Sequence, residues 1–179
     1  MTESSKASIA LAIPAPHPPY PAEPRWENFP SKLTIRPQWV LWAYLFRDGR
    51  WTKCPFQPDG SFASATDPAT WAPFEFVQCA YFSLDDDDDA RFDGVGFVVT
   101  ATDPFTVFDF DHCRDPETGE IDPTIASYVH QLDSYTEVSP SGTGVRVVVE
   151  ATLPPHHRRL GRVEMYNDRR FVSFTGHVL

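Results

Sequence analysis

The sequence is poor in cysteine and in long apolar runs, and each shortage excludes a class of protein. Its three cysteines, Cys54, Cys79 and Cys113, are widely spaced and form no CxxC pair. This pattern argues against a disulfide framework or a closed zinc site, so we expect a reducing, cytoplasmic location. No stretch approaches the ~20 apolar residues of a membrane-spanning helix, and we expect no membrane partner.

Basic residues are also scarce. The chain has 15 Lys and Arg against 25 Asp and Glu, a formal net charge of −10. This balance argues against a surface that coats nucleic acid broadly. It is compatible with a local basic groove or with a phosphate site bridged by metal. Five of the acids form one run, residues 85–89, which we expect to be a solvated loop.

Proline, by contrast, is concentrated at the start of the chain. Residues 1–30 are rich in Pro, Ala and Ser, a composition typical of extended, poorly packed chain. We interpret them as a flexible tail that docks through Trp26 and Phe29. Residues 31–179 are then one domain, long enough to bury a single core.

Within this domain the pattern predicts strands mixed with two helices, an α+β fold with a mixed or antiparallel sheet and flanking helices. Aromatic-rich segments on either side of Gly49 predict a hairpin, with Trp39, Trp42 and Trp51 in the core. Asp67-Pro68 predicts the start of a helix that extends to about 83 and breaks near Pro73. The remaining elements are strands at 93–100 and 104–111 separated by a turn, a helix at 122–132, a strand–turn–strand at 134–151, and a hairpin at 162–176.

The segment "FTVFDFDHC", residues 105–113, places two aspartates near the end of an apolar strand. Alternate strand residues share a face, so Asp109 and Asp111 project together while Phe110 packs the other way. Like charges this close repel unless a cation lies between them, and Mg²⁺ or Mn²⁺ prefers such oxygen ligands. The alternative is an exposed strand end with two solvated acids, and D-x-D also occurs in glycosyltransferases.

A second segment, "SPSGTGVRVVV", residues 139–149, joins a turn of small residues to a valine-rich strand. Ser141 and Gly142 belong to this turn, where glycine lets backbone N–H groups approach an anion. Arg146 stands in the strand and needs an anion, either a carboxylate of this protein or a phosphate. The alternative is an ordinary hairpin turn with Arg146 at an exposed edge.

Two further segments supply charged candidates. Glu164 lies between Val163 and Met165 and is a candidate third carboxylate, and Arg170 is a candidate phosphate ligand in the same segment. Lys53 lies on an aromatic-flanked strand and is a candidate nucleotide contact. Ordinary surface ion pairs are the alternative for the segment at 162–176.

Taken in order, the segments resemble a known family. The series "PQWVLW", "GRWTKCPFQP", "ASATDPATWAPF", "DGVGFV", "FTVFDFDHC", "SYTEVSPSGTGVRVVV" and "VEMYNDRRFVSFTG" is similar to the primase-polymerase domain of phage, plasmid and integrated-element replication proteins. That domain belongs to the archaeo-eukaryotic primase superfamily. The resemblance covers roughly residues 36–177 and implies a primase-like core with an RRM-like element.

What the resemblance implies is template-directed nucleotidyl transfer by a two-metal DNA polymerase or primase. Asp109, Asp111 and Glu164 would hold Mg²⁺ or Mn²⁺. Ser141, Gly142 and Arg146 would contact the triphosphate, and Lys53 and Arg170 are further candidate contacts. The implied partners are a DNA primer-template, nucleoside triphosphates and a fused or separate helicase.

The chain departs from the family pattern in two ways. Arg146 stands where relatives commonly have His, and Arg is neither a neutral ligand nor a proton relay near pH 7. The chain also ends soon after the third motif, as expected of a truncated or a minimal domain. One alternative is therefore a catalytically impaired nucleotide- or DNA-binding module that recruits replication partners. Another is a sugar-nucleotide transferase, which would have a parallel Rossmann-like sheet.

Overall fold

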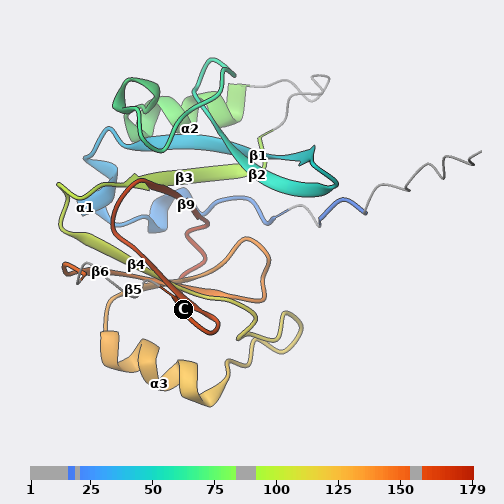
Figure 1. The fold of residues 1–179 in the computed structure, drawn as a ribbon, viewed down its shortest axis with the longest axis vertical. Helices are drawn as coiled ribbons and strands as arrows, with labels where there is room; N and C mark the ends of the chain where they lie inside the picture. Colours follow the sequence, from blue (N-terminus) through green and yellow to red (C-terminus); the bar gives the residue numbers. More distant parts are fainter. Residues whose placement is uncertain (1–15, 19–20, 84–91, 154–158) are drawn as a thin grey trace, which may run out of the picture.

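The computed structural model describes residues 16–18, 21–83, 92–153 and 159–179. The predicted acidic loop at 85–89 and most of the predicted tail lie outside these residues. In the described part, two sheets pack together and a helix covers each outer face (Figure 1). One helix, α2 (Phe74–Ser83), lies over the first sheet, and α3 (Pro123–Leu132) lies under the second.

The first sheet has the strand order β2-β1-β3-β9 and the second has the order β5-β6-β4-β8-β7. Every strand pair in the described part of the chain is antiparallel. This confirms the α+β class and contradicts the parallel sheet expected of a sugar-nucleotide transferase. The strands are β1 (Trp39–Arg47), β2 (Arg50–Phe56), β3 (Gly94–Val99), β4 (Phe105–Phe110), β5 (Tyr135–Val138), β6 (Val145–Glu150), β7 (Arg159–Leu160), β8 (Val163–Tyr166) and β9 (Arg170–Phe174).

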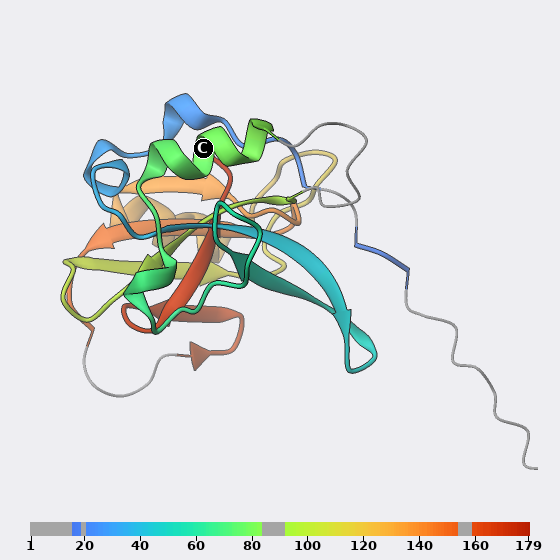
Figure 2. The same cartoon turned by 90° about the horizontal axis from the view of Figure 1, so that it is seen from above.

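The local signals at turns and helix starts are confirmed. β1 and β2 form the predicted hairpin, whose turn residues Asp48 and Gly49 both have positive φ, and it extends beyond the rest of the body in Figure 2. The helix predicted at 68–83 is broken near Pro73 into a 3-10 turn, Pro68–Thr70, and α2. Asp67 and Asp122 cap the 3-10 turn and α3 by accepting N–H bonds.

The predicted hairpin at 162–176 is wrong. β8 pairs with β4 and β7 in the second sheet, whereas β9 pairs with β3 in the first. The strands predicted at 93–100 and 104–111 likewise belong to different sheets. The composition of both segments, 93–111 and 162–176, indicates a strand, a turn and a second strand. It does not distinguish a hairpin from two strands that belong to different sheets. Here Arg169, at φ 52°, turns the chain from one sheet to the other.

The aromatic core holds the sheets and the N-terminal segment together. Trp39, Phe97 and Phe174 are fully buried on one face of the first sheet and pack with Phe74 of α2. Two short helices, η1 (Trp26–Asn28) and α1 (Ser31–Thr34), precede β1. Trp26 and the buried Phe29 pack against this core, which agrees with the predicted docking.

The predicted core position is confirmed for two of the three tryptophans. Trp39 and Trp42 are buried, as predicted, whereas Trp51 is only half-buried. Cys54, Cys79 and Cys113 are all free thiols. None of the described helices has both the length and the apolar character needed to cross a bilayer.

Candidate functional site

A row of charged residues crosses the inner face of the second sheet. The strand register places Glu137, Arg146, Asp109, Glu164 and Arg159 opposite one another on the five neighbouring strands. Directly opposite residues in antiparallel strands have Cβ atoms about 4.5–5.5 Å apart. The row therefore brings together acids and arginines that are far apart in the sequence.

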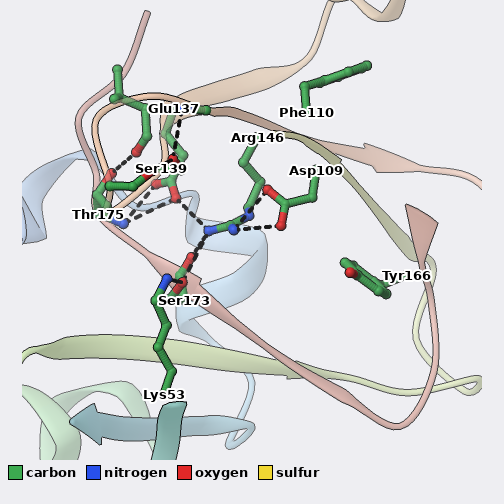
Figure 3. A network of polar contacts seen from close by, with 12 residues as sticks. Lys53, Asp109, Phe110, Glu137, Ser139, Arg146, Tyr166, Ser173 and Thr175 are labelled. Carbon is green, nitrogen blue, oxygen red and sulfur yellow. Dashed lines mark hydrogen bonds and ion pairs between the residues drawn. The ribbon is translucent and has the colours of Figure 1, made fainter. Parts of the chain in front are cut away.

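The row begins where the side chains on the inner face of β4 change from apolar to charged. Phe105 and Val107 share its inner face with Asp109, and both are buried in the aromatic core. Phe110 points the other way and packs in the cluster that contacts α3, as predicted (Figure 3). The inner face is thus apolar at the start of the strand and charged at its end.

Arg146 is the centre of the row. Its Nη2 lies 3.0 Å from both carboxylate oxygens of Asp109, and the side chains are only 5% and 17% exposed. Its Nη1 donates to the backbone oxygen of Ser173 on β9 and lies 3.8 Å from Oε1 of Glu137 (Figure 3). Of the two anions left open for Arg146, a carboxylate of this protein is the one that it contacts here.

Glu137 is fully buried and is not among the residues predicted from the sequence. Its carboxylate accepts hydrogen bonds from the N–H groups of Thr175 at 3.1 Å and Gly176 at 2.8 Å. It also accepts one from the hydroxyl of Tyr135 at 2.8 Å. Burial raises the pKa of Glu137, while Arg146 and these donors oppose the rise. The sequence did contain a signal for Glu137, because the predicted strand–turn–strand at 134–151 has Glu137 on one strand and Arg146 on the other.

The three predicted carboxylates lie in one region. Glu164 is directly opposite Asp109, and Asp111 follows Asp109 by two residues. The Asp111 residue is exposed, but its carboxyl group is partly desolvated, and this desolvation and then the charges of Asp109 and Glu164 raise its pKa. Repulsion among these groups is what a bound cation would relieve.

No three His, Cys, Asp or Glu side chains in the described ranges converge as ligands of one metal ion. Asp109 is paired with Arg146, and Glu164 is paired with Arg159 at 2.9 Å. Each carboxylate oxygen has two lone pairs, so pairing with an arginine leaves acceptor sites for a cation. The donor set fits Mg²⁺ or Mn²⁺ in its chemistry, and its role in metal binding stays a prediction.

A cleft of about 660 Å³ lies between the two sheets beside this row. Asp109 contributes to its wall, together with Ser173 and Tyr166. The guanidinium carbon of Arg170 lies 4.7 Å from the centre of the Tyr166 ring. Five cationic side chains line the cleft: Arg50, Lys53, Arg146, Arg169 and Arg170.

Lys53 enters the cleft from β2. Its Nζ lies 5.0 Å from the centre of a Trp42 ring and 3.4 Å from the hydroxyl of Ser173 (Figure 3). Burial, and then the charge of Arg146, lower the pKa of Lys53 to about 8. Gly94 makes room for Trp42, because a Cβ at that position would lie 2.8 Å from the indole nitrogen.

The turn that contains Ser141 and Gly142 is not part of the cleft lining. It lies next to the segment after Asp111, since the N–H groups of Cys113 and Arg114 donate to the Thr143 oxygen at 2.9 Å. The N–H groups of Gly142 and Gly144 donate within the turn, to the oxygen and the hydroxyl of Ser139. The predicted contact of this turn with a phosphate therefore stays a prediction.

The structure thus brings Lys53, Arg146 and Arg170 together around Asp109. Arg50 and Tyr166 were missed as lining residues. Tyr166 follows Glu164 by two residues, so strand alternation was a usable signal for it. Arg50 ends the hairpin turn, and nothing in its local sequence marks it as a cleft residue.

Comparison with known proteins gives one informative match. The chain is 33% identical over 148 residues to a protein named DNA primase-polymerase from Nitratiruptor phage NrS-1, a match that covers 79% of this chain and 19% of the phage protein. No family model matches. The chain spans about a fifth of the length of that relative. The match confirms the resemblance to primase-polymerases.

Proposed function

We propose that this domain, which is related to a phage DNA primase-polymerase, is a template-directed nucleotidyltransferase that extends a DNA primer or makes one. The observation that carries the proposal is the charge of the cleft. A chain with 15 basic residues and a net charge of −10 gathers five cations in one cleft, next to a group of three carboxylates. A nucleoside triphosphate bound with a divalent cation complements both.

Lys53, Arg50 and Arg170 are the proposed triphosphate ligands. They line the cleft from β2 and β9, which are the two edge strands of the first sheet. Guanidinium and ammonium groups form strong, charge-assisted hydrogen bonds with phosphate oxygens. Arg146 is 5% exposed, and we assign it to holding the Asp109 carboxylate in place.

Asp109, Asp111 and Glu164 are the proposed holders of Mg²⁺ or Mn²⁺. A divalent ion there would supply Lewis-acid stabilisation of the transferring phosphoryl group. The protein's own part is to fix Asp109 through Arg146 and to keep Asp111 exposed at the end of β4. The free cysteines support a reducing cytoplasm as the place of action, and a helicase partner stays a prediction.

Primer extension tests the proposal. A labelled primer-template is incubated with deoxynucleotides and Mg²⁺ or Mn²⁺, and wild type is compared with Asp111→Asn. Asp111 is exposed and makes no ion pair within the described residues, so the variant is expected to fold. Asp115→Asn is the matched control, because Asp115 is an exposed acid that does not line the cleft.

Metal-dependent extension that is lost in Asp111→Asn and retained in Asp115→Asn is the expected result. The pairing of Asp109 with Arg146 favours a second candidate, a catalytically impaired nucleotide-binding module. That module would bind nucleotide in the cleft without extension by wild type. A protein that binds no nucleotide would contradict both candidates.

A further inference from the structure

A second cleft of about 590 Å³ adjoins the first, and the proposed function does not use it. Ala65 and Arg169 line both clefts, so the two are contiguous. Its walls come from residues 37–38 just before β1, the segment around 65–71, and the turns at 100–102 and 168–169. The segment "ASATDPATWAPF" was part of the family resemblance, but no role follows for it from the first cleft.

The lining of the second cleft differs in chemistry from that of the first. It has one cation, Arg169, one carboxylate, Asp168, one aromatic ring, Trp71, and three threonines at positions 66, 100 and 102. A triphosphate needs several cations, as the first cleft provides. One nucleotide unit of a DNA strand carries a flat base and a single phosphate charge, which one ring and one arginine complement.

The aromatic wall is held rigidly. The indole N–H of Trp71 donates to the Ser64 oxygen at 2.6 Å, and the Ser64 N–H donates to the Thr70 hydroxyl at 3.0 Å. The Thr70 hydroxyl in turn donates to the Asp67 oxygen at 2.7 Å. A ring fixed in this way loses little conformational entropy when a base stacks on it, so less of the stacking free energy is lost to ordering the side chain.

Arg169 lies at the boundary of the two clefts. The N–H of Ala101 donates to the Asp168 carboxylate at 3.0 Å, which ties the turn at 168–169 to the turn at 100–102. Arg169 is exposed and forms no ion pair with any described residue. Its charge is therefore available to a phosphate that links the two clefts.

We propose that the second cleft binds a nucleotide unit of single-stranded DNA, with its base against Trp71 and its phosphate on Arg169, next to the nucleotide in the first cleft. This inference rests on the proposed function, since a polymerase needs a DNA strand beside its nucleotide. The geometry places that strand on the side of the molecule where the two sheets are joined by the turns at 100–102 and 168–169.

The test measures two affinities separately. A fluorescent oligothymidylate reports DNA binding by anisotropy, and calorimetry with dATP and Mg²⁺ reports nucleotide binding. The variants are Trp71→Leu, with Trp71→Phe to restore a ring, and Arg169→Gln. Arg47→Gln is the matched control, because Arg47 is an exposed arginine outside both clefts. Thermal unfolding checks that each variant folds. If Trp71→Leu does not fold, Arg169→Gln still tests the proposal, because Arg169 is exposed and its replacement should leave the fold intact.

We expect Trp71→Leu to weaken oligothymidylate binding about tenfold and Trp71→Phe to recover most of it, since a base stacks on either ring. Arg169→Gln should reduce the salt dependence of DNA binding by about 0.7 in log–log slope, the loss of one single-strand phosphate contact. Nucleotide affinity should stay unchanged in Trp71→Leu and Trp71→Phe, because Trp71 does not line the first cleft. Arg169 lines both clefts, so Arg169→Gln is judged by DNA binding alone. Unchanged DNA binding, absent DNA binding by wild type, or a loss of dATP affinity in Trp71→Leu equal to its loss of DNA affinity would each overturn the inference. The dATP titration of wild type tests nucleotide binding in the first cleft, and thus the proposed function, independently of the DNA measurements.

Discussion

Asp109 and Arg146 face each other across β4 and β6, and one guanidinium nitrogen lies 3.0 Å from both oxygens of the carboxylate. The pair joins the residue most central to the proposed metal site to the buried Glu137 and to β9. A buried arginine with two carboxylate neighbours is stable only as a set, because removing one member leaves an uncompensated charge.

Replacing Arg146 by Met should therefore destabilise the protein strongly. The change leaves Glu137 and Asp109 without their cation in a buried environment, at a cost of about 3–5 kcal/mol. Urea unfolding followed by circular dichroism measures this loss. The matched control is Arg159→Met, which breaks the ion pair with Glu164 but removes a side chain that is 72% exposed. Exposed pairs contribute about 0–1 kcal/mol, so equal losses in the two variants would contradict the prediction.

The raised pKa of Asp111 predicts how stability changes with pH. The folded protein binds this proton more tightly than the unfolded chain, so the contribution of Asp111 to stability falls as pH rises through the ordinary carboxyl pKa and then the raised one. Asp111→Asn should remove this fall and raise stability at pH 7 by less than about 1 kcal/mol, since the group is screened by solvent. Urea unfolding between pH 3 and pH 7 without divalent cation tests this.

Asp115→Asn provides a control of opposite sign. The N–H groups of Thr118 and Glu117 lower the pKa of Asp115. Its charge is therefore stabilising above the ordinary carboxyl pKa, and the stabilisation is lost as pH falls. Asp115→Asn should decrease stability at pH 7. A decrease in Asp111→Asn as well would show that desolvation and repulsion do not destabilise the charged form of Asp111 in the folded protein.

The lowered pKa of Lys53, about 8, predicts a pH-dependent affinity for nucleotide. A triphosphate prefers the protonated lysine, so affinity should fall as pH rises through about 8 and Lys53 loses its charge in the free protein. In Lys53→Arg the charge persists, and the fall between pH 7 and pH 9 should be reduced. Calorimetric titration with dATP at several pH values measures this. Identical pH profiles in wild type and Lys53→Arg would rule out Lys53 as the titrating group.

Gly96 is predicted to be required for the packing of the first sheet. A Cβ there would lie 2.8 Å from the Phe171 ring and 3.0 Å from the backbone oxygen of Val172, just before Ser173 in the cleft. Gly96→Ala should cost about 1–3 kcal/mol, the usual range for overpacking. Chemical denaturation measures the cost. Gly49→Asn is the control, because the space around Gly49 is open and Asn tolerates positive φ; a similar loss there would contradict the steric explanation.

Much of the local structure was predictable from the sequence. Strand alternation placed Phe110 on the face opposite Asp109, and Asp67-Pro68 marked the start of what is a 3-10 turn. These features depend on neighbouring residues, whose geometry is set by the backbone alone. The common order of the motifs was enough to indicate the relationship to primase-polymerases.

The pairing of distant strands was decided by the tertiary structure. The segment at 162–176 reads as a hairpin, yet β8 joins β4 and β9 joins β3, because the partner of a strand depends on which apolar faces it buries and not on its own turn. The anion facing Arg146 and the five-cation cleft follow from that pairing. The sequence by itself determined which residues share a face, whereas only the packing of the two sheets decided which faces meet and thus where the cleft lies.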